Sequence, residues 1–293
     1  MSKEDLVLKK IKSIELKTKK LVSALNLGAY KSAMKGQGMT FSDFREYVPG
    51  DDVRNISWSL IAKTGKPYVK QFEEERELSV YFLMDTSYSM YSGAHHMLKI
   101  EMAMYVMASI AMSAQKNNDL SGLILFSKNM ESFVHPKKSQ SHVRRLITEI
   151  LKFKPYTSSS EGLSEACNLV LEHQKKKSVI FIFSDFINLP ENKKMIQTLA
   201  KKHQVVACMM NDTSSNPDTY KILGDFKVRN LTDSLILNSG WGKIRSVWKE
   251  YLNTLESKKN AFLKSNSMDQ IVFNTNEDFY KPLVMYFKRK SRS

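Results

Sequence analysis

The fold is indicated first by residues 78–89, Leu78-Ser-Val-Tyr-Phe-Leu-Met-Asp85-Thr-Ser-Tyr-Ser89. Residues 78–84 are almost all apolar, β-branched or aromatic, and an acidic residue and several hydroxyl side chains follow them directly. A short run of this composition is typical of a strand that is buried on both faces of a sheet. We therefore predict a buried strand that ends at Asp85.

Downstream of this strand, helical and strand-like patterns alternate. Residues 98–116 are apolar on nearly all sides, as expected of a central helix, and 121–126 and 132–134 read as strands. Ser139 or Ser141 can cap an amphipathic helix that continues to Leu151. The pattern continues with helices at 163–173, 191–202, 241–264 and 277–287 and strands at 178–183, 204–210, 222–228 and 270–273. Wholly apolar strands between helices predict an α/β fold, a doubly wound and mostly parallel sheet.

The residues before this region have a different character. Residues 4–25 carry leucine and isoleucine at a loosely helical period among lysines, which predicts an N-terminal helix. Residues 39–77 are polar and aromatic-rich, with turn signals at 49–52 and 64–67, and match neither a simple helix nor a simple strand, although 68–72 is rich in strand formers. We predict an N-terminal segment of residues 1–77, a domain of residues 78–290 and a basic C-terminal tail within 281–293.

The positive charge of the chain lies mainly at its ends. Residues 1–35 contain nine lysines and three acidic residues, and residues 281–293 contain five basic residues and no acidic one. The two ends therefore carry +11 of the formal net charge of +15. Basic ends of this kind are usually solvated extensions. We expect no specific nucleic-acid binding, and only weak, salt-sensitive contact with DNA.

Hydropathy and cysteine content predict the cellular compartment. No apolar run reaches the roughly 18 residues that cross a bilayer. The first residues do not resemble a signal peptide, and Cys167 and Cys208 form no CxxC pair. We expect a soluble, cytoplasmic protein without a transmembrane segment.

Acidic and hydroxyl side chains follow two of the predicted strands. Asp85, Ser87 and Ser89 come after the first strand, and Asp185 comes after the strand at 178–183. Thr157 to Ser160 add a hydroxyl-rich loop before a helix. Ligands of doubly wound sheets bind beyond the carboxyl ends of the strands, and oxygen ligands of this kind suit Mg²⁺, with Mn²⁺ as the alternative. Each residue taken alone is also a common turn or capping residue.

Two motifs resemble known families. Asp85-x-Ser87-x-Ser89, followed by a hydroxyl loop and Asp185, resembles the metal-ion-dependent adhesion site of von Willebrand factor type A domains. The stretches 41–58, 62–70 and 72–76 (FSDFREYVPGDDVRNISW, AKTGKPYVK and FEEER) resemble the signature of a bacterial family catalogued as domain of unknown function fifty-eight. Members join this signature to a type A domain and are typically encoded beside MoxR-type AAA+ ATPases. The resemblance covers about residues 28–290 and implies an adaptor of such an ATPase without enzymatic activity.

The resemblance also implies how a metal would be held. Ser87, Ser89 and a loop hydroxyl, from Thr157 or Ser160, would be direct ligands, and Asp85 and Asp185 would act largely through water. The ion would then lack one anionic ligand, which an acidic side chain of a partner protein can supply. This chain departs from the family pattern, because Thr157 to Glu161 replace the usual Gly-Thr-Asp turn.

Two further departures concern the signature. Ser57 stands where the family usually has Asp, and Lys63 where it has Arg, so we expect no ion pair between them. The charged residues around Pro49-Gly50 are open to two interpretations. They form either a self-contained ion-pair network that packs Tyr47 and Trp58 onto the domain, or a docking surface for the ATPase.

Enzymatic alternatives have less support in the sequence. A hydrolase would use Ser87 or Ser184 with Asp185 and a histidine, but the chain has no GxSxG turn and no paired histidine spacing. A metal-dependent nuclease would use Asp85 and Asp185, yet such enzymes usually need several direct carboxylate ligands. Cleavage of phosphodiesters that required Asp85 would decide in its favour.

Overall fold

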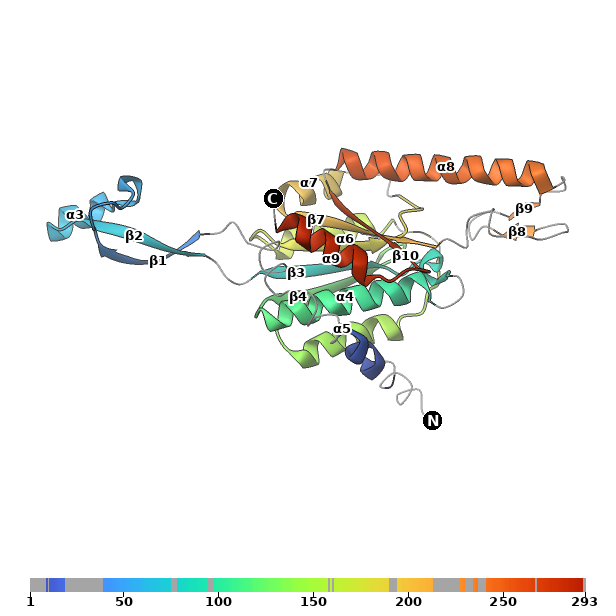
Figure 1. The fold of residues 1–293 in the computed structure, drawn as a ribbon, viewed down its shortest axis with the longest axis horizontal. Helices are drawn as coiled ribbons and strands as arrows, with labels where there is room; N and C mark the ends of the chain where they lie inside the picture. Colours follow the sequence, from blue (N-terminus) through green and yellow to red (C-terminus); the bar gives the residue numbers. More distant parts are fainter. Residues whose placement is uncertain are drawn as a thin grey trace.

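The computed structural model of the chain describes residues 9, 11–18, 39–74, 78–93, 97–157, 159, 161–189, 194–212, 227–229, 234–236, 241–266 and 268–291. At its centre lies a six-stranded sheet with the strand order β10-β7-β6-β3-β4-β5 (Figure 1). The strands are β3 (Ser79–Asp85), β4 (Leu120–Phe126), β5 (Met130–Lys137), β6 (Val179–Ser184), β7 (Gln204–Asn211) and β10 (Asp269–Asn274).

Five of the six strands are parallel, and only β5 at one edge runs antiparallel to its neighbour β4. The reversal follows from chain length, because only residues 127–129 separate the two strands and a parallel return would need a crossover. Every residue of β3 and of β6 is buried, as expected for strands covered on both faces. The predicted fold class, a doubly wound and mostly parallel α/β sheet, is confirmed.

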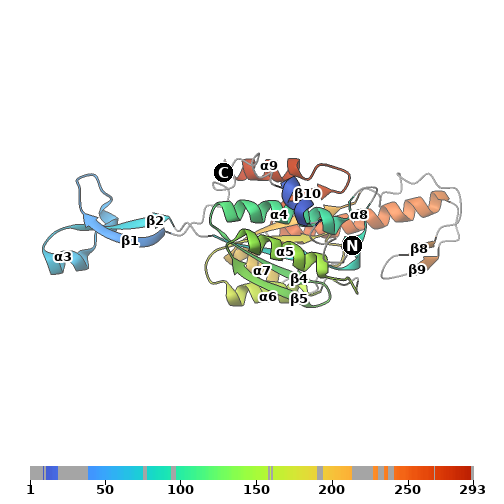
Figure 2. The same ribbon diagram turned by 90° about the horizontal axis from the view of Figure 1, so that it is seen from below.

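Helices cover both faces of the sheet (Figures 1 and 2). Residues of α4 (Lys99–Lys116), α5 (Gln140–Lys152), α9 (Tyr280–Lys290) and the helix at 11–18 share one apolar cluster with one face of the sheet. Residues of α6 (Leu163–His173), α7 (Lys194–Lys202) and α8 (Trp241–Ser265) share a second cluster with the other face. The sheet is thus the middle of three layers, and α4 is buried along most of its length.

The N-terminal helix belongs to the core over its described part, residues 11–18. Ile11 and Ile14 are buried in the cluster that contains α4 and α5. The Thr18 hydroxyl lies 3.0 Å from the sulfur of Met112, and Arg144 Nε on α5 lies 2.6 Å from Glu15 Oε1. The remainder of the helix predicted for 4–25 lies outside the described residues, apart from Lys9.

The helix predicted for 277–287 is confirmed, whereas the expectation of a solvated basic tail is wrong over 281–290. These residues form most of α9, in which Leu283, Tyr286 and Phe287 are buried. Lys290 Nζ lies 2.9 Å from Asp269 Oδ2 at the start of β10. The positive charges occupy the outer face of a packed helix, a pattern that composition by itself does not reveal.

Residues 39–74 form a small lobe with regular structure, beyond one end of the large sheet (Figure 1). β1 (Met39–Glu46) and β2 (Tyr68–Glu74) pair antiparallel, and η1 (Val53–Asn55) and α3 (Trp58–Thr64) lie between them in sequence. The sequence did not predict β1, because a shift of register between Phe41 and Asp43 interrupts the alternation that identifies a strand.

The last region of the chain is described in parts. β8 (Lys227–Arg229) and β9 (Ser234–Ile236) form a short antiparallel pair. The strand predicted for 222–228 lies outside the described residues up to 226, and the helix predicted from 191 is described from Lys194. Over the described part of the chain, no helix combines the length and the hydropathy that crossing a bilayer requires.

Candidate metal centre

The residues of the candidate site come from the carboxyl ends of two adjacent central strands. β3 ends at Asp85 and leads into η2 (Tyr88–Tyr91), and β6 ends at Ser184, directly before Asp185. The turn after β3 is fixed to β4, because both the amide and the hydroxyl of Thr86 donate to the carbonyl oxygen of Phe126, at 2.8 and 2.9 Å. The parallel pairing of β3 with β6 thus brings Asp85 and Asp185 to the same end of the sheet, where the parallel strands have their carboxyl ends.

Asp85 is fully buried and hydrogen-bonded through both carboxylate oxygens. Its Oδ1 accepts from the amide of Ser87 at 2.9 Å, and its Oδ2 accepts from the hydroxyl of Ser184 at 2.6 Å. Burial, and then the negative charge of Asp185, raise the pKa of Asp85 to about 6. Two carboxylates that repel each other in this way are stabilised when a cation binds between them.

Two hydroxyl groups stand beside this carboxylate. Ser87 and Ser89 are both buried, and their Oγ atoms are 3.1 Å apart. Adjacent ligands of an octahedral ion with bonds of about 2.1 Å are about 3.0 Å apart, so this spacing suits Mg²⁺. Hydroxyl and carboxylate oxygens are also the ligand types that Mg²⁺ and Mn²⁺ prefer, and the residues present fit such an ion. Over the described residues, no cluster of three or more His, Cys, Asp or Glu side chains could hold a metal.

The hydroxyl loop lies against the turn that follows β3. The carbonyl oxygen of Thr157 accepts from the amide of Tyr88 at 2.9 Å, and the Thr157 hydroxyl accepts from the amide of Ser159 at 3.2 Å. Ser160, the alternative hydroxyl ligand, lies outside the described residues. The structure thus brings Thr157 close to Ser87 and Ser89.

Contacts that the sequence did not reveal hold this loop in place. Tyr156 OH and Ser127 Oγ both donate to Glu131 Oε1, and the amide of Gly162 donates to the carbonyl oxygen of Ser127 at 2.9 Å. A Cβ atom on Gly162 would lie 2.4 Å from the backbone of Asn129, so a larger residue does not fit there. The β4–β5 turn therefore positions the loop.

Asp185 lies on a constrained turn beside a buried lysine. The next residue, Phe186, has a φ of 52°, in the left-handed region that side chains rarely adopt, and its amide donates to Ser184 Oγ at 2.9 Å. Asp185 Oδ1 accepts from the amide of Ile187 at 3.2 Å, and Asp185 Oδ2 lies 3.0 Å from Lys99 Nζ. Sequence reasoning missed Lys99, although a lysine at the start of an almost wholly apolar helix was a signal.

The hydrolase alternative requires a histidine near a serine. Four of the six histidines of the chain are described. His142 Nε2 lies 2.7 Å from the carbonyl oxygen of Ser121, and His173 Nδ1 lies 3.0 Å from that of Leu169. His135 packs against the rings of Phe133 and His173, and His203 is buried before β7, at the opposite end of that strand from the Asp85 edge. His95 and His96 lie outside the described residues.

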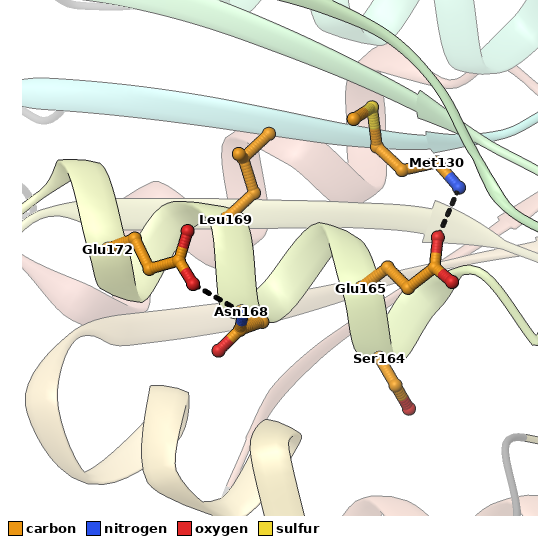
Figure 3. A pocket seen from close by; sticks show the side chains of 6 residues that line it. All are labelled: Met130, Ser164, Glu165, Asn168, Leu169 and Glu172. Carbon is orange, nitrogen blue, oxygen red and sulfur yellow. Dashed lines mark hydrogen bonds between the residues drawn. The ribbon is translucent and has the colours of Figure 1, made fainter.

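A shallow hollow of about 300 Å³ lies along α6, beside the first residue of β5 (Figure 3). Its carboxylates already accept hydrogen bonds from the protein: Glu165 Oε2 from the amide of Met130 at 2.9 Å, and Glu172 Oε1 from Asn168 at 2.7 Å. None of its lining residues is a predicted metal ligand. The hollow is therefore separate from the candidate metal centre.

The signature region contains the ion pairs that one interpretation predicted. Arg45 Nη1 donates to Asp51 Oδ2 at 2.7 Å, and Arg54 Nη2 to Asp52 Oδ2 at 2.8 Å. Ser57 Oγ lies 3.2 Å from Ser59 Oγ. The expectation that Trp58 packs onto the domain is wrong, because this residue is 72% exposed at the start of α3.

Comparison with known sequences gives a family match over most of the domain. A model of the family described as "Protein of unknown function DUF58" matches residues 43–231. The uncharacterized protein Rv1480 of Mycobacterium tuberculosis is 23% identical over 203 residues, which is 69% of this chain and 64% of that protein. The uncharacterized protein Mb1516 of Mycobacterium bovis matches to the same extent. The chain thus spans 64% of the length of these curated relatives.

Solved structures with distant similarity were also found. An aerotolerance-related membrane protein from Bacteroides fragilis is 13% identical, with a TM-score of 0.47, covering 73% of this chain and 98% of that chain. BatB, a conserved hypothetical protein from Bacteroides thetaiotaomicron, is 15% identical with a TM-score of 0.45, covering 74% of this chain and 100% of that chain. The SpRpn10 VWA domain is 13% identical with a TM-score of 0.35 and covers 45% of this chain and 74% of that chain.

Proposed function

The chain belongs to the DUF58 family, whose model matches residues 43–231, and we propose its function from the candidate metal centre. The function is that of a non-enzymatic, metal-dependent adaptor, which captures an acidic side chain of a partner protein. The adaptor works in the cytoplasm with a MoxR-type AAA+ ATPase in the assembly or activation of other complexes.

The observation that carries this proposal is that two carboxylates and two hydroxyls lie together at the carboxyl ends of two adjacent central strands. Asp85, Ser87 and Ser89 lie on one buried turn, and Asp185 follows the neighbouring strand. Hydroxyl oxygens are neutral, so they hold a divalent ion without cancelling its charge. Mg²⁺, when bound, would supply a positive centre with room for one further carboxylate.

The protein side chains would act by orientation. The hydrogen bonds from Ser87 and Ser184 fix the Asp85 carboxylate, and the contact of Tyr88 with the Thr157 loop places the hydroxyls beside it. None of these contacts requires a proton to move. With a divalent ion bound, this arrangement would support binding of a carboxylate more directly than cleavage of a bond.

The exposed Tyr88 and Tyr156 belong to the two segments that carry the hydroxyls, at 39% and 52% exposure. Tyrosines exposed beside a binding site contribute contact area with little loss of conformational freedom. We propose that the partner contributes an acidic residue at the metal and an apolar residue against these rings.

Divalent metal should stabilise the protein, because a ligand that binds only the folded state raises its stability. With about 1 mM Mg²⁺ and a dissociation constant of about 0.1 mM, the gain in the free energy of unfolding is about 1.4 kcal/mol, or a melting temperature higher by about 3 °C. Differential scanning fluorimetry in Mg²⁺, Mn²⁺ and EDTA measures this shift. Identical melting curves in all three would exclude a preformed site.

Capture of the MoxR-type ATPase tests the adaptor role. In a pull-down, the wild type should retain the ATPase in Mg²⁺ and lose at least about nine-tenths of it in EDTA, and Ser87→Ala should fail in both, because a direct ligand is missing. Ser132→Ala is the matched control, since Ser132 lies on β5 and its hydroxyl contacts Glu149 at 2.6 Å.

Three outcomes of this experiment would count against the proposal. Equal capture by all variants in Mg²⁺ and EDTA would remove the metal from the mechanism. Loss of capture by Arg54→Glu alone would place the contact on the signature lobe instead. Metal-dependent cleavage of a phosphodiester substrate that Asp85→Ala abolishes would favour the nuclease alternative.

A further inference from the structure

The candidate metal centre already contains a positive charge that belongs to the protein. Lys99 Nζ lies 3.0 Å from Asp185 Oδ2, and the side chains of Lys99 and Asp185 are only 5% and 3% exposed. Lysine is rarely buried to this degree, because removing an ammonium group from water is costly unless a partner compensates the charge. Asp185 is that partner, and it is also one of the two predicted carboxylates of the metal site.

The position of Lys99 in its helix does not account for this burial. Lys99 is the first residue of α4, where the helix dipole favours a negative side chain over a positive one. The start of α4 is held by other groups: the amide of Leu98 donates to Glu101 Oε2 at 3.2 Å, and the amide of Met102 donates to the carbonyl oxygen of Leu98 at 3.0 Å. The ammonium group is therefore directed to the site, although the helix does not need it as a cap.

A second lysine, Lys259 on α8, adds positive charge that acts on Asp185. Burial lowers the pKa of Lys259 on α8, and Lys99 lowers it further, whereas Asp185 and Glu256 raise it. Two ammonium groups thus act on Asp185, while Asp85 has hydrogen bonds from Ser87 and Ser184. Asp185 is thus the carboxylate that contacts Lys99, at 3.0 Å.

We propose that Lys99 is a tethered cation that competes with the divalent metal for Asp185 and so sets the metal affinity of the site. This inference rests on the proposed metal-dependent function and adds the way in which the site is regulated. In the metal-free protein, the Lys99 ammonium group compensates part of the negative charge of Asp185. A divalent ion that uses Asp185 must bind against the repulsion of Lys99 or displace its ammonium group.

Two consequences follow from this competition. The wild type should bind Mg²⁺ more weakly than its ligand set allows, so that occupancy changes with Mg²⁺ concentration instead of being permanent. Metal binding should also be coupled to the start of α4, because Lys99 is the first residue of that helix.

The test measures Mg²⁺ and Mn²⁺ affinity of the full chain by isothermal titration calorimetry. Lys99→Gln removes the charge and keeps a donor for Asp185, so the variant should fold. Its dissociation constant for Mg²⁺ should fall at least about tenfold. Lys99→Arg keeps the charge and should bind like the wild type, as should Lys116→Gln, a lysine removed at the far end of α4. Circular dichroism with and without Mg²⁺ shows whether each variant is folded.

The outcomes separate this inference from the proposed function. Tighter binding by Lys99→Gln than by the wild type, lost in Lys99→Gln/Ser87→Ala, supports both. The same result with no metal binding by the wild type supports the competition and overturns the metal-dependent function. Binding by Lys99→Gln with the wild-type affinity, lost on Ser87→Ala, overturns the competition and leaves the metal site in place. Absence of metal binding in every variant overturns both. If Lys99→Gln folds only with Mg²⁺, the metal has replaced the lysine as the counter-charge of Asp185, which supports the inference.

Discussion

Asp85→Asn should make the metal-free protein more stable at pH 8, by about 2 kcal/mol in the free energy of unfolding, and should abolish its response to Mg²⁺. The carboxylate is fully buried, and burial followed by the charge of Asp185 raises its pKa to about 6. Above that pH the folded protein contains a buried charge that the unfolded chain exposes to water. Asparagine removes the charge at nearly constant shape and can still accept from the amide of Ser87.

The pH dependence of this difference has a definite sign. The folded carboxyl holds its proton up to about pH 6, whereas the unfolded one, with a pKa near 3.8, releases it earlier. As the pH falls from about 6 to 4, the wild type recovers the stability that the charge removes, and the gap to Asp85→Asn should close. Urea denaturation in EDTA at pH 8, 6 and 4 measures the gap, and a gap that widens toward pH 4 would contradict this account.

Asp185→Asn is the matched control, and the structure predicts the opposite result for it. Asp185 is as deeply buried as Asp85, but Lys99 Nζ lies 3.0 Å from its carboxylate. Neutralising Asp185 leaves a buried ammonium group without its partner, which should cost about 3 kcal/mol or more. If both variants changed stability in the same direction, the charge assignment at this edge of the sheet would be wrong.

Ile14→Asp should lower the free energy of unfolding by about 3 kcal/mol or more, because it places a charge in the apolar cluster of α4 and α5. Ile14 is 0% exposed, whereas Leu16, two residues further along the same helix, is 67% exposed. Leu16→Asp is therefore the control and should change stability by less than about 0.5 kcal/mol. Urea denaturation followed by circular dichroism compares the two variants.

Local release of the helix would give the same variant a second signature. If the helix at 11–18 separates from α5 while the domain stays folded, the Arg144–Glu15 pair is lost and protease cleavage in this segment should become faster in Ile14→Asp. Equal stability and equal protease resistance of Ile14→Asp and Leu16→Asp would show that the helix contributes nothing to the core.

Much of the large domain could be predicted from local patterns. The apolar strands and the cap at Ser139 are each encoded by a few neighbouring residues, and the structure places them where the patterns indicate. The strand β1 was not predictable in this way, because the irregularity between Phe41 and Asp43 breaks its alternation. The helix α9 was predicted from its apolar pattern, but its basic residues suggested a solvated tail, because composition does not show that one face of the helix is buried.

Local patterns are enough to predict the doubly wound sheet and the order of Asp85, the Thr157 loop and Asp185 along the chain, because hydrophobic periodicity and strand ends are local properties. Which charges face one another depends on how the chain packs in three dimensions. Lys99 and Asp185 are 86 residues apart, and Asp85 and Ser184 are 99 apart. Whether a buried carboxylate meets a lysine, a hydroxyl or another carboxylate depends on strand order and helix packing, since electrostatic energy depends on distances in space that no sequence spacing specifies.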